Sequence, residues 1–404
     1  GNSYEGLCEY VGGKYISYTE EKPITMNPFR INREELNVEK TGFLKNLVLL
    51  IWKGSQGTVT KTEDRLIDQV ITEYYDTYFN GFTGFTPPLR EDLRKSLIID
   101  DRNRSHQNPD ETEAQREERL ERTINQIEQR RKELKVESLS FNTFYEFIRD
   151  EYQEILKTKR TREKDFDVWG FLNVLEPYYK GGEYDFLLNS DRQLDLLGKR
   201  FIVFELDNIR DNKVLLPIVT IIIMETFINK MRKLKGIRKM ILIEECWKAL
   251  ASANMSNYIR YLFKTVRKFF GEAVVVTQEV EDIISSPIVK GTIINNSDCK
   301  ILLDQRKYVN KFDEIQSLLG LTDKERAQIL SINMANSPSR KYKEVWIGLG
   351  GTQSAVYATE VSPEEYCTYT TEETEKLEVM RLTRKLGGNI ELAIKQLAES
   401  KRKK

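Results

Sequence analysis

The chain has 404 residues, of which 40% are hydrophobic and 31% charged, and its 63 basic residues balance 63 acidic ones. This length predicts two or three globular domains, and the balanced charge gives no overall field to attract nucleic acid, although a local basic patch would still attract it. Four scattered cysteines without a CxxC pair argue against a zinc site or disulfide framework and fit a reducing, cytoplasmic setting. The one histidine, His106, lies in a polar loop, which disfavours histidine-based catalysis.

The first 55 residues have the pattern of an α/β segment. A short helix is predicted in "SYEGLCEYVG", a strand in "KYISYT", and a strand with a turn in "ITMNPFRI". The run "EKTGFLKNLVLLIWKG" predicts a buried helix that Gly54 closes. Because the chain begins "GNSYEGL", without methionine or a signal peptide, we expect it to be part of a longer protein.

Residues 56–195 read as an all-α insertion domain. Apolar residues recur at helical spacing in "EDRLIDQVITEYYDTYF", "SFNTFYEFIRDEYQEILK" and "FDVWGFLNVLEPYY", and no convincing strand is found. The run "DETEAQREERLERTINQIEQRRKELK" is dense in charge, with few apolar positions. It is interpreted as a solvated helix face or the arm of a helical hairpin, with a partner-binding role as the alternative.

The α/β pattern returns in residues 196–404. Strands are predicted in "RFIVFEL", "KMILIEE", "EAVVVTQ" and "DCKILLDQ", with helices between them. An antiparallel hairpin is predicted in "KEVWIGLGGTQSAVYATEV", and two helices close the chain. The longest apolar run, Val214 to Phe227, is too short to span a bilayer and contains Pro217, so we predict a buried helix.

These elements predict an α/β fold in which a mostly parallel, doubly wound sheet is interrupted by the helical insertion. We assign residues 1–55 and 196–404 to one domain, and expect residues 1 to about 55 to lie in the same sheet as residues 199–360. Ligands of such sheets bind beyond the carboxyl ends of the strands.

Two adjacent carboxylates, Glu244 and Glu245, follow the strand in "KMILIEE". The four residues before them show no polar alternation, which predicts a strand covered on both faces. A buried strand that ends in two acids is typical of the Walker B motif of nucleotide hydrolases. Glu244 would then hold Mg²⁺ through water, and Glu245 would orient and polarise the attacking water. The alternative is that both acids cap the next helix.

The next strand ends in Gln278, whose neutral amide could hydrogen-bond both the γ-phosphate of ATP and the attacking water. A glutamine at a strand end is weak evidence alone, but acids and an amide on successive parallel strands point into one crevice. Between them, "KTVRKFFG" places Lys264, Arg267 and Lys268 on a helix. They form either a solvated basic face, or a surface from which Arg267 reaches a phosphate in its own site or a neighbour's.

The chain resembles the TraG family of conjugative-transfer ATPases, within the FtsK/HerA superclass. The resemblance rests on "GNSYEGLCEYVGGKYISY", "MNPF", "MILIEECW", "RKFFGEAVVVTQ" and "EVWIGLGGTQSAVYATEVSPEE". It implies a RecA-like P-loop core, an all-α insertion, a hexameric working form, and ATP-driven pilus assembly or substrate transfer with other secretion components at the inner membrane. Glu244, Glu245, Arg267 and Gln278 match the family's site positions. The family usually has Asp-Glu-Ala-Trp where this chain has Glu-Glu-Cys-Trp, and the departure falls on the metal-side residue, Glu244.

The chain contains no G-x-x-x-x-G-K-[ST] phosphate loop, since "GGKY" lacks both the spacing and the hydroxyl. We therefore expect the C-terminal part of the ATPase, which by itself neither holds Mg-ATP nor hydrolyses it. Two other functions remain open: a DNA-pumping motor like a coupling protein, which the neutral charge does not support, and a non-catalytic docking subunit of a secretion complex.

Overall fold

The computed structural model describes residues 4–19, 21–54, 57–103, 111–133, 135–152, 165–191, 196, 198–244, 253–278, 290–335 and 342–402. The chain divides into two compact units. The first unit comprises Gly1–Lys22, Asp195–Leu216 and Thr226–Lys404, and the second comprises Pro23–Leu194 and Pro217–Glu225. No described helix is long and apolar enough to cross a membrane.

The second unit is built from helices, and its described residues contain no strand. Asn37 begins the buried helix α2 by accepting a hydrogen bond from the Lys40 N–H at 2.9 Å, and Gly54 ends it with a φ of 67°. This confirms the helix predicted up to Gly54. The helices of this unit are α2 (Val38–Lys53), α3 (Lys61–Asn80), α4 (Pro87–Asn103), α5 (Glu113–Glu133), α6 (Phe141–Phe147), α8 (Val168–Leu175) and α9 (Asp185–Leu188).

Of the strand and turn predicted in residues 24–31, the turn is confirmed at residues 28–29 and the strand is wrong, because no residue of this segment is in a strand. The Asn27 side chain accepts hydrogen bonds from the backbone N–H groups of Phe29 and Arg30 at 3.1 and 3.2 Å, and donates one to the Leu139 carbonyl at 2.8 Å. An asparagine that satisfies local backbone groups in this way competes with strand pairing. The turn carries Phe29 into the aromatic core, where it packs against Phe144.

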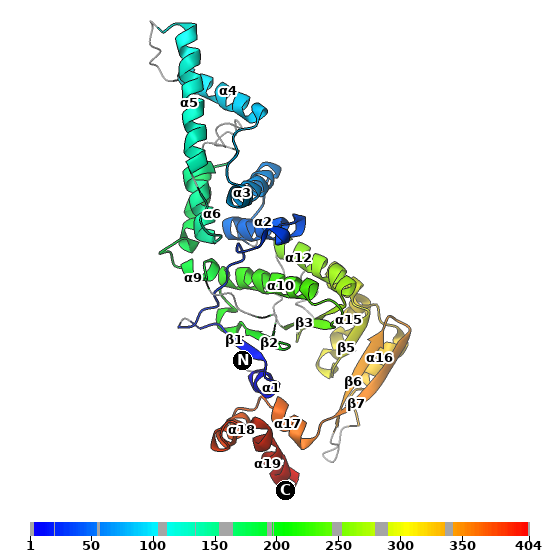
Figure 1. Ribbon diagram of the computed structural model, residues 1–404. Coiled ribbons are helices and arrows are strands. Elements are labelled where there is room, and N and C mark those ends of the chain that lie inside the picture. The colour runs from blue at the N-terminus through cyan, green and yellow to red at the C-terminus, as the bar shows by residue number, and fades with distance from the viewer. Residues whose placement is uncertain are drawn as a thin grey trace. The chain divides into compact units, whose positions relative to one another are not determined.

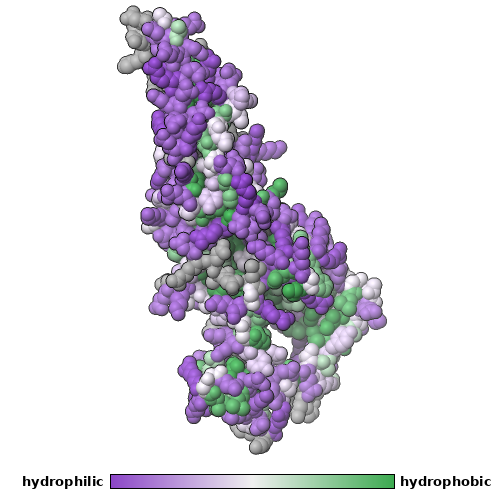
Figure 2. Space-filling model, viewed as in Figure 1, coloured by the Kyte–Doolittle hydropathy of each residue, from purple (hydrophilic) through white to green (hydrophobic). Residues whose placement is uncertain are grey.

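Ion pairs join α4 to α5, which lie side by side in Figure 1. Arg90 of α4 bonds Glu128 and Glu121 of α5 at 2.6 and 2.8 Å. A small apolar cluster that includes Leu93 and Ile124 lies between the helices. Hydrophilic side chains cover much of this pair in Figure 2, in accordance with a helical hairpin arm that has a solvated surface.

A buried ion pair links α2 to α10 (Leu215–Lys233) within the second unit. Lys40 Nζ lies 3.3 Å from Glu225 Oε1, and each side chain is only 8% exposed. Lys40 also lies over the Phe43 ring, 5.1 Å from its centroid. Two charges so far from water stabilise the unit only as long as both are present.

The first unit contains all the described strands, in three sheets. β1 pairs with β2 and β3 with β4, both in parallel, while β5, β6 and β7 form an antiparallel sheet. The strands are β1 (Lys14–Ser17), β2 (Ile202–Glu205), β3 (Lys239–Glu244), β4 (Gly271–Val276), β5 (Cys299–Leu302), β6 (Tyr342–Leu349) and β7 (Gln353–Glu360). The other helices of this unit are α1 (Glu5–Tyr10), α12 (Ala253–Thr265), α15 (Phe312–Leu319), α16 (Asp323–Leu330), α17 (Pro363–Tyr369), α18 (Glu373–Lys385) and α19 (Ile390–Arg402).

Two sequence expectations about the sheet need correction. The strands do not join into one doubly wound sheet in the described residues, because β2 bonds only to β1 and the β5–β7 hairpin sheet has its own antiparallel register. β3 is not covered on both faces: Met240 and Leu242 are 56% and 45% exposed, while Ile243 is buried. An unbroken apolar run in the sequence indicates a strand and its length, but it does not show whether other elements cover both faces of that strand.

The antiparallel sheet has the hairpin predicted around the glycine turn. Gly350 and Gly351, with φ of 54° and 69°, make the turn between β6 and β7. Trp346 of β6 is 1% exposed and packs with Phe312 and Ile329 of the helices α15 and α16. Its indole N–H donates to Gln328 Oε1 at 3.0 Å, which satisfies the buried donor.

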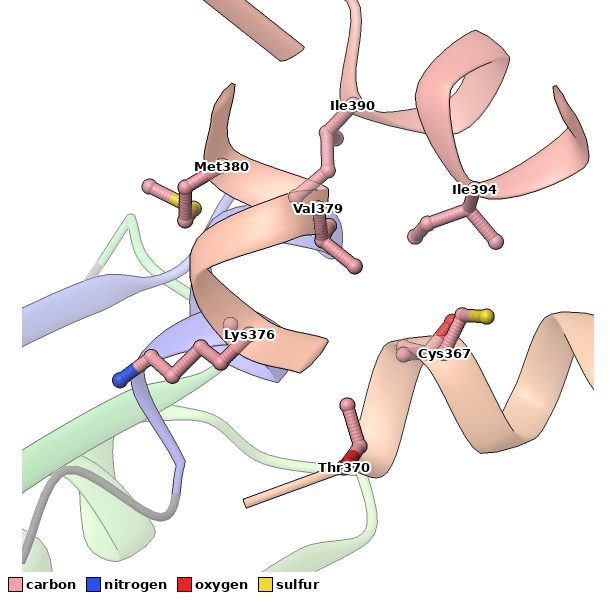
Figure 3. A pocket seen from close by; sticks show the side chains of 9 residues that line it. Cys367, Thr370, Lys376, Val379, Met380, Ile390 and Ile394 are labelled. Carbon is pink, nitrogen blue, oxygen red and sulfur yellow. The ribbon is translucent and has the colours of Figure 1, made fainter. Parts of the chain in front are cut away.

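The three C-terminal helices form a small bundle that holds α1. Cys367 of α17, Val379 of α18 and Ile394 of α19 form its buried cluster, and they converge on the pocket in Figure 3. Lys376 of α18 bonds Glu5 of α1 at 2.8 Å. This ion pair therefore holds the first turn of α1 against the bundle.

Candidate functional site

The carboxyl ends of β3 and β4 meet at one edge of their sheet. The register pairs Glu244, the last residue of β3, with Val276, the last residue of β4. Gln278 follows two residues later, and both Glu244 and Gln278 are exposed to solvent. Parallel pairing thus brings the two predicted site residues, Glu244 and Gln278, to the same edge of the sheet.

Glu244 has a neighbour that the sequence did not reveal. The pKa of the Tyr4 hydroxyl is raised, first by burial and then by the charge of Glu244 and a hydrogen bond to its carboxylate. Tyr4 directly precedes α1, and its carbonyl accepts the Cys8 N–H at 2.9 Å. No spacing rule relates residue 4 to residue 244, so only the packed structure shows this contact.

Gln278 is held through its backbone. The Tyr308 hydroxyl, in the turn Arg306–Lys311, donates to the Gln278 carbonyl oxygen at 3.3 Å. This bond uses the main chain of Gln278, so it does not occupy the side-chain amide. Tyr308 was also missed from the sequence, because its segment reads as an ordinary polar connection.

Arg267 lies at the opposite edge of the sheet. It belongs to the 3-10 turn Val266–Phe269, which comes just before the amino end of β4. The six residues of β4 at about 3.3 Å each separate that edge from Gln278 by roughly 20 Å. The structure therefore does not bring Arg267 together with Glu244 and Gln278 within one chain. A contact with a phosphate on a neighbouring copy stays a prediction, and Lys264, Arg267 and Lys268 are all exposed.

Glu245, the predicted water-activating residue, lies outside the described residues, as do Trp247 and His106. Three cysteines of the described part of the chain, Cys8, Cys299 and Cys367, are free.

The donor set at this edge suits Mg²⁺ rather than a metal enclosed by protein. Among the residues that the structure describes, no group of three or more His, Cys, Asp or Glu side chains could hold a metal ion. Mg²⁺ commonly keeps several waters and is bound by one or two carboxylates together with substrate phosphates. One exposed carboxylate at the end of β3 fits that arrangement.

A family model and the known proteins compared with this chain all point to TraG and VirB4 proteins. The family model of the TraG P-loop domain matches residues 1–102 and 90–401 of the chain. The type IV secretion system protein VirB4 of Bartonella quintana (strain Toulouse) and that of Bartonella henselae are each 27% identical to it over 151 residues. That match covers 37% of this chain and 18% of each relative, so the chain matches less than a fifth of the length of these relatives.

A solved structure, VirB4 of Thermoanaerobacter pseudethanolicus, aligns with a TM-score of 0.53 over 90% of this chain and 80% of the other. At 16% sequence identity this likeness concerns the fold alone. Together with the family model it indicates an α/β fold of the P-loop NTPase kind.

Proposed function

The chain belongs to the TraG P-loop domain family, and from this premise we propose that it is part of an ATPase that energises type IV secretion or conjugation. The observation that carries the proposal is the shared edge of the parallel strands β3 and β4, where Glu244 ends β3 and Gln278 follows the end of β4 by two residues. Carboxylates and amides gathered at the carboxyl ends of parallel strands are suited to a metal-bound phosphate ligand.

Each residue has a distinct role in the proposed reaction. Glu244 would hold Mg²⁺ through water, and the ion would supply positive charge against the phosphates of ATP. Glu245 takes a proton from the attacking water or orients it toward the γ-phosphate. The Gln278 amide donates to a γ-phosphate oxygen and accepts from the same water, so that it senses which nucleotide is present. Arg267 is outside this set.

In the longer protein we place this edge in a hexamer that works with other secretion components at the cytoplasmic side of the inner membrane. ATP hydrolysis there drives pilus assembly or substrate transfer. The family membership supports this context, and the helical arm of α4 and α5 offers a solvated surface for partners.

The test is the substitution Gln278→Ala in the full-length natural protein. We expect ATP turnover to fall about tenfold or more, because an oriented hydrogen bond to the reacting groups is lost, while ATP binding is largely kept. Turnover is measured by phosphate release and binding by calorimetry. Gln353→Ala, which removes an exposed amide at the start of β7, is the matched control. Equal turnover in both variants would exclude Gln278 from the site.

A further inference from the structure

Tyr4 reaches the proposed site from the start of the chain. Its hydroxyl donates a hydrogen bond to the carboxylate of Glu244, the last residue of β3. Glu244 is exposed to solvent, and an exposed glutamate side chain samples several rotamers that point its carboxylate in different directions. The bond with Tyr4 restricts this freedom. The residue proposed to hold Mg²⁺ through water therefore has a partner that orients it.

Other contacts hold the segment that carries Tyr4. The Tyr4 carbonyl accepts a hydrogen bond from the N–H of Cys8 at 2.9 Å, and Cys8 is only 1% exposed. Glu5, the next residue, bonds Lys376 of α18, labelled in Figure 3, at 2.8 Å. The helix α1 also packs against β1 and α17. Because these contacts already hold Tyr4 in place, its bond to Glu244 is better explained by its effect on the carboxylate than by support of the fold.

The bond leaves the Glu244 carboxylate able to hold a hydrated metal ion. A tyrosine hydroxyl is protonated at neutral pH and donates one hydrogen. A carboxylate has two oxygens with about four acceptor positions, so one bond to Tyr4 leaves positions for water molecules on Mg²⁺. Carboxylates of metal sites commonly have such a hydrogen-bond partner, which fixes their direction.

A second tyrosine makes the same kind of bond away from the proposed site. The Tyr15 hydroxyl donates to Glu205 Oε2 at 3.4 Å, and Glu205 is also the last residue of a parallel strand, β2. This pair belongs to a separate two-stranded sheet, whereas Glu244 shares its sheet edge with Gln278. Tyr15 is therefore a matched comparison, with the same chemistry at a strand end to which no metal role is assigned.

We propose that Tyr4 is a positioning residue of the ATPase site, whose hydroxyl fixes the direction of the Glu244 carboxylate and so strengthens the hold of the site on the magnesium ion of Mg-ATP. The inference rests on the proposed function, because that function places Glu244 on the metal side. In this role Tyr4 touches neither the nucleotide nor the attacking water. Loss of its hydroxyl should therefore weaken the binding of the metal, and excess metal should overcome the effect.

The experiment measures binding of Mn²⁺, as a probe for Mg²⁺, to the full-length natural protein saturated with a non-hydrolysable ATP analogue. Electron paramagnetic resonance of free Mn²⁺ gives the affinity without any turnover. We expect Tyr4→Phe to weaken Mn²⁺ binding about tenfold, the lower end of the range for lost partners of metal ligands. The Mg²⁺ concentration for half-maximal ATP turnover should rise by a similar factor. Tyr15→Phe, which removes the hydroxyl of the comparison pair, should change neither quantity.

The substitution Glu244→Gln separates positioning from support of the fold. It removes the carboxylate that Tyr4 orients, so adding Tyr4→Phe to it should cause no further loss of Mn²⁺ affinity. If Tyr4 acted independently of Glu244, the two losses would add, and the proposal would be wrong. Because phenylalanine keeps the ring, Tyr4→Phe should melt at nearly the same temperature as the unchanged protein.

The remaining outcomes distinguish this inference from the proposed function. If Tyr4→Phe bound Mn²⁺ normally while Glu244→Gln bound it weakly, Tyr4 would have no positioning role and the proposed site would stand. Tighter binding by Tyr4→Phe would show that the hydroxyl competes with metal-bound water for the carboxylate, which also overturns the inference. If Glu244→Gln itself bound Mn²⁺ normally, the metal role of Glu244 in the proposed function would be wrong, and the role of Tyr4 would fail with it.

Discussion

Replacing Glu245 by glutamine is expected to reduce ATP turnover of the full-length natural protein by about a hundredfold to ten-thousandfold, the range of a lost general base. Glutamine has nearly the same shape but accepts no proton, so the attacking water is no longer activated. The phosphate contacts do not involve this carboxylate, so ATP binding should be retained. Phosphate release gives the turnover and calorimetry with Mg-ATP gives the affinity.

Glu205→Gln is the matched control for this variant. Glu205 is likewise the last residue of a parallel strand, β2, but its carboxylate accepts a bond from the Tyr15 hydroxyl at 3.4 Å, in a separate sheet. We expect turnover near that of the unchanged protein. If both variants turned over ATP at the same rate, an acid at a strand end would not identify the water-activating residue, and the assignment of Glu245 would be wrong.

Removal of the Glu225 carboxylate should have the largest effect on stability. In Glu225→Ala, Lys40 loses its buried counter-charge, and breaking such a pair costs roughly 3–5 kcal/mol. Urea unfolding, followed by circular dichroism, measures the loss in the free energy of unfolding.

The exposed pair Glu391 and Lys395 provides the comparison. These side chains lie 2.6 Å apart in α19 and are about 60% exposed, so water screens their attraction and Glu391→Ala should have little effect on the free energy of unfolding. The double variant Lys40→Met and Glu225→Met should recover much of the loss, because no charge is then buried. A cost for Glu225→Ala as small as that for Glu391→Ala would mean that Lys40 reaches water.

Local signals in the sequence predicted most of the elements. The periodicity of α2 and its closing Gly54, and the glycine turn of the β6–β7 hairpin, depend on residues close together in the chain. The pairing of β3 with β4 followed from two apolar runs joined by a helix. The positions of Glu244 and Gln278 could be predicted in the same way, because each residue lies at or just after the carboxyl end of a predicted strand.

Features that depend on distant contacts were not predictable. The bond of Tyr4 with Glu244 joins segments with no sequence relationship. The turn after Asn27 was predicted, but the strand before it was not found, because the apolar residues there gave no sign that the Asn27 side chain bonds the backbone of the next residues. Arg267 was predicted to reach a phosphate in its own site or in a neighbour's, and because it lies in the turn before β4, at the other edge, only the neighbour's site stays a prediction.

The proposed site is tested most directly by an experimental structure of the full-length natural protein with Mg²⁺ and a non-hydrolysable ATP analogue. We expect the γ-phosphate at the carboxyl edge of β3 and β4, with a metal-bound water on Glu244, Glu245 facing the attacking water, and the Gln278 amide on a phosphate oxygen. An analogue bound elsewhere, with Glu244 and Gln278 far from its phosphates, would contradict it.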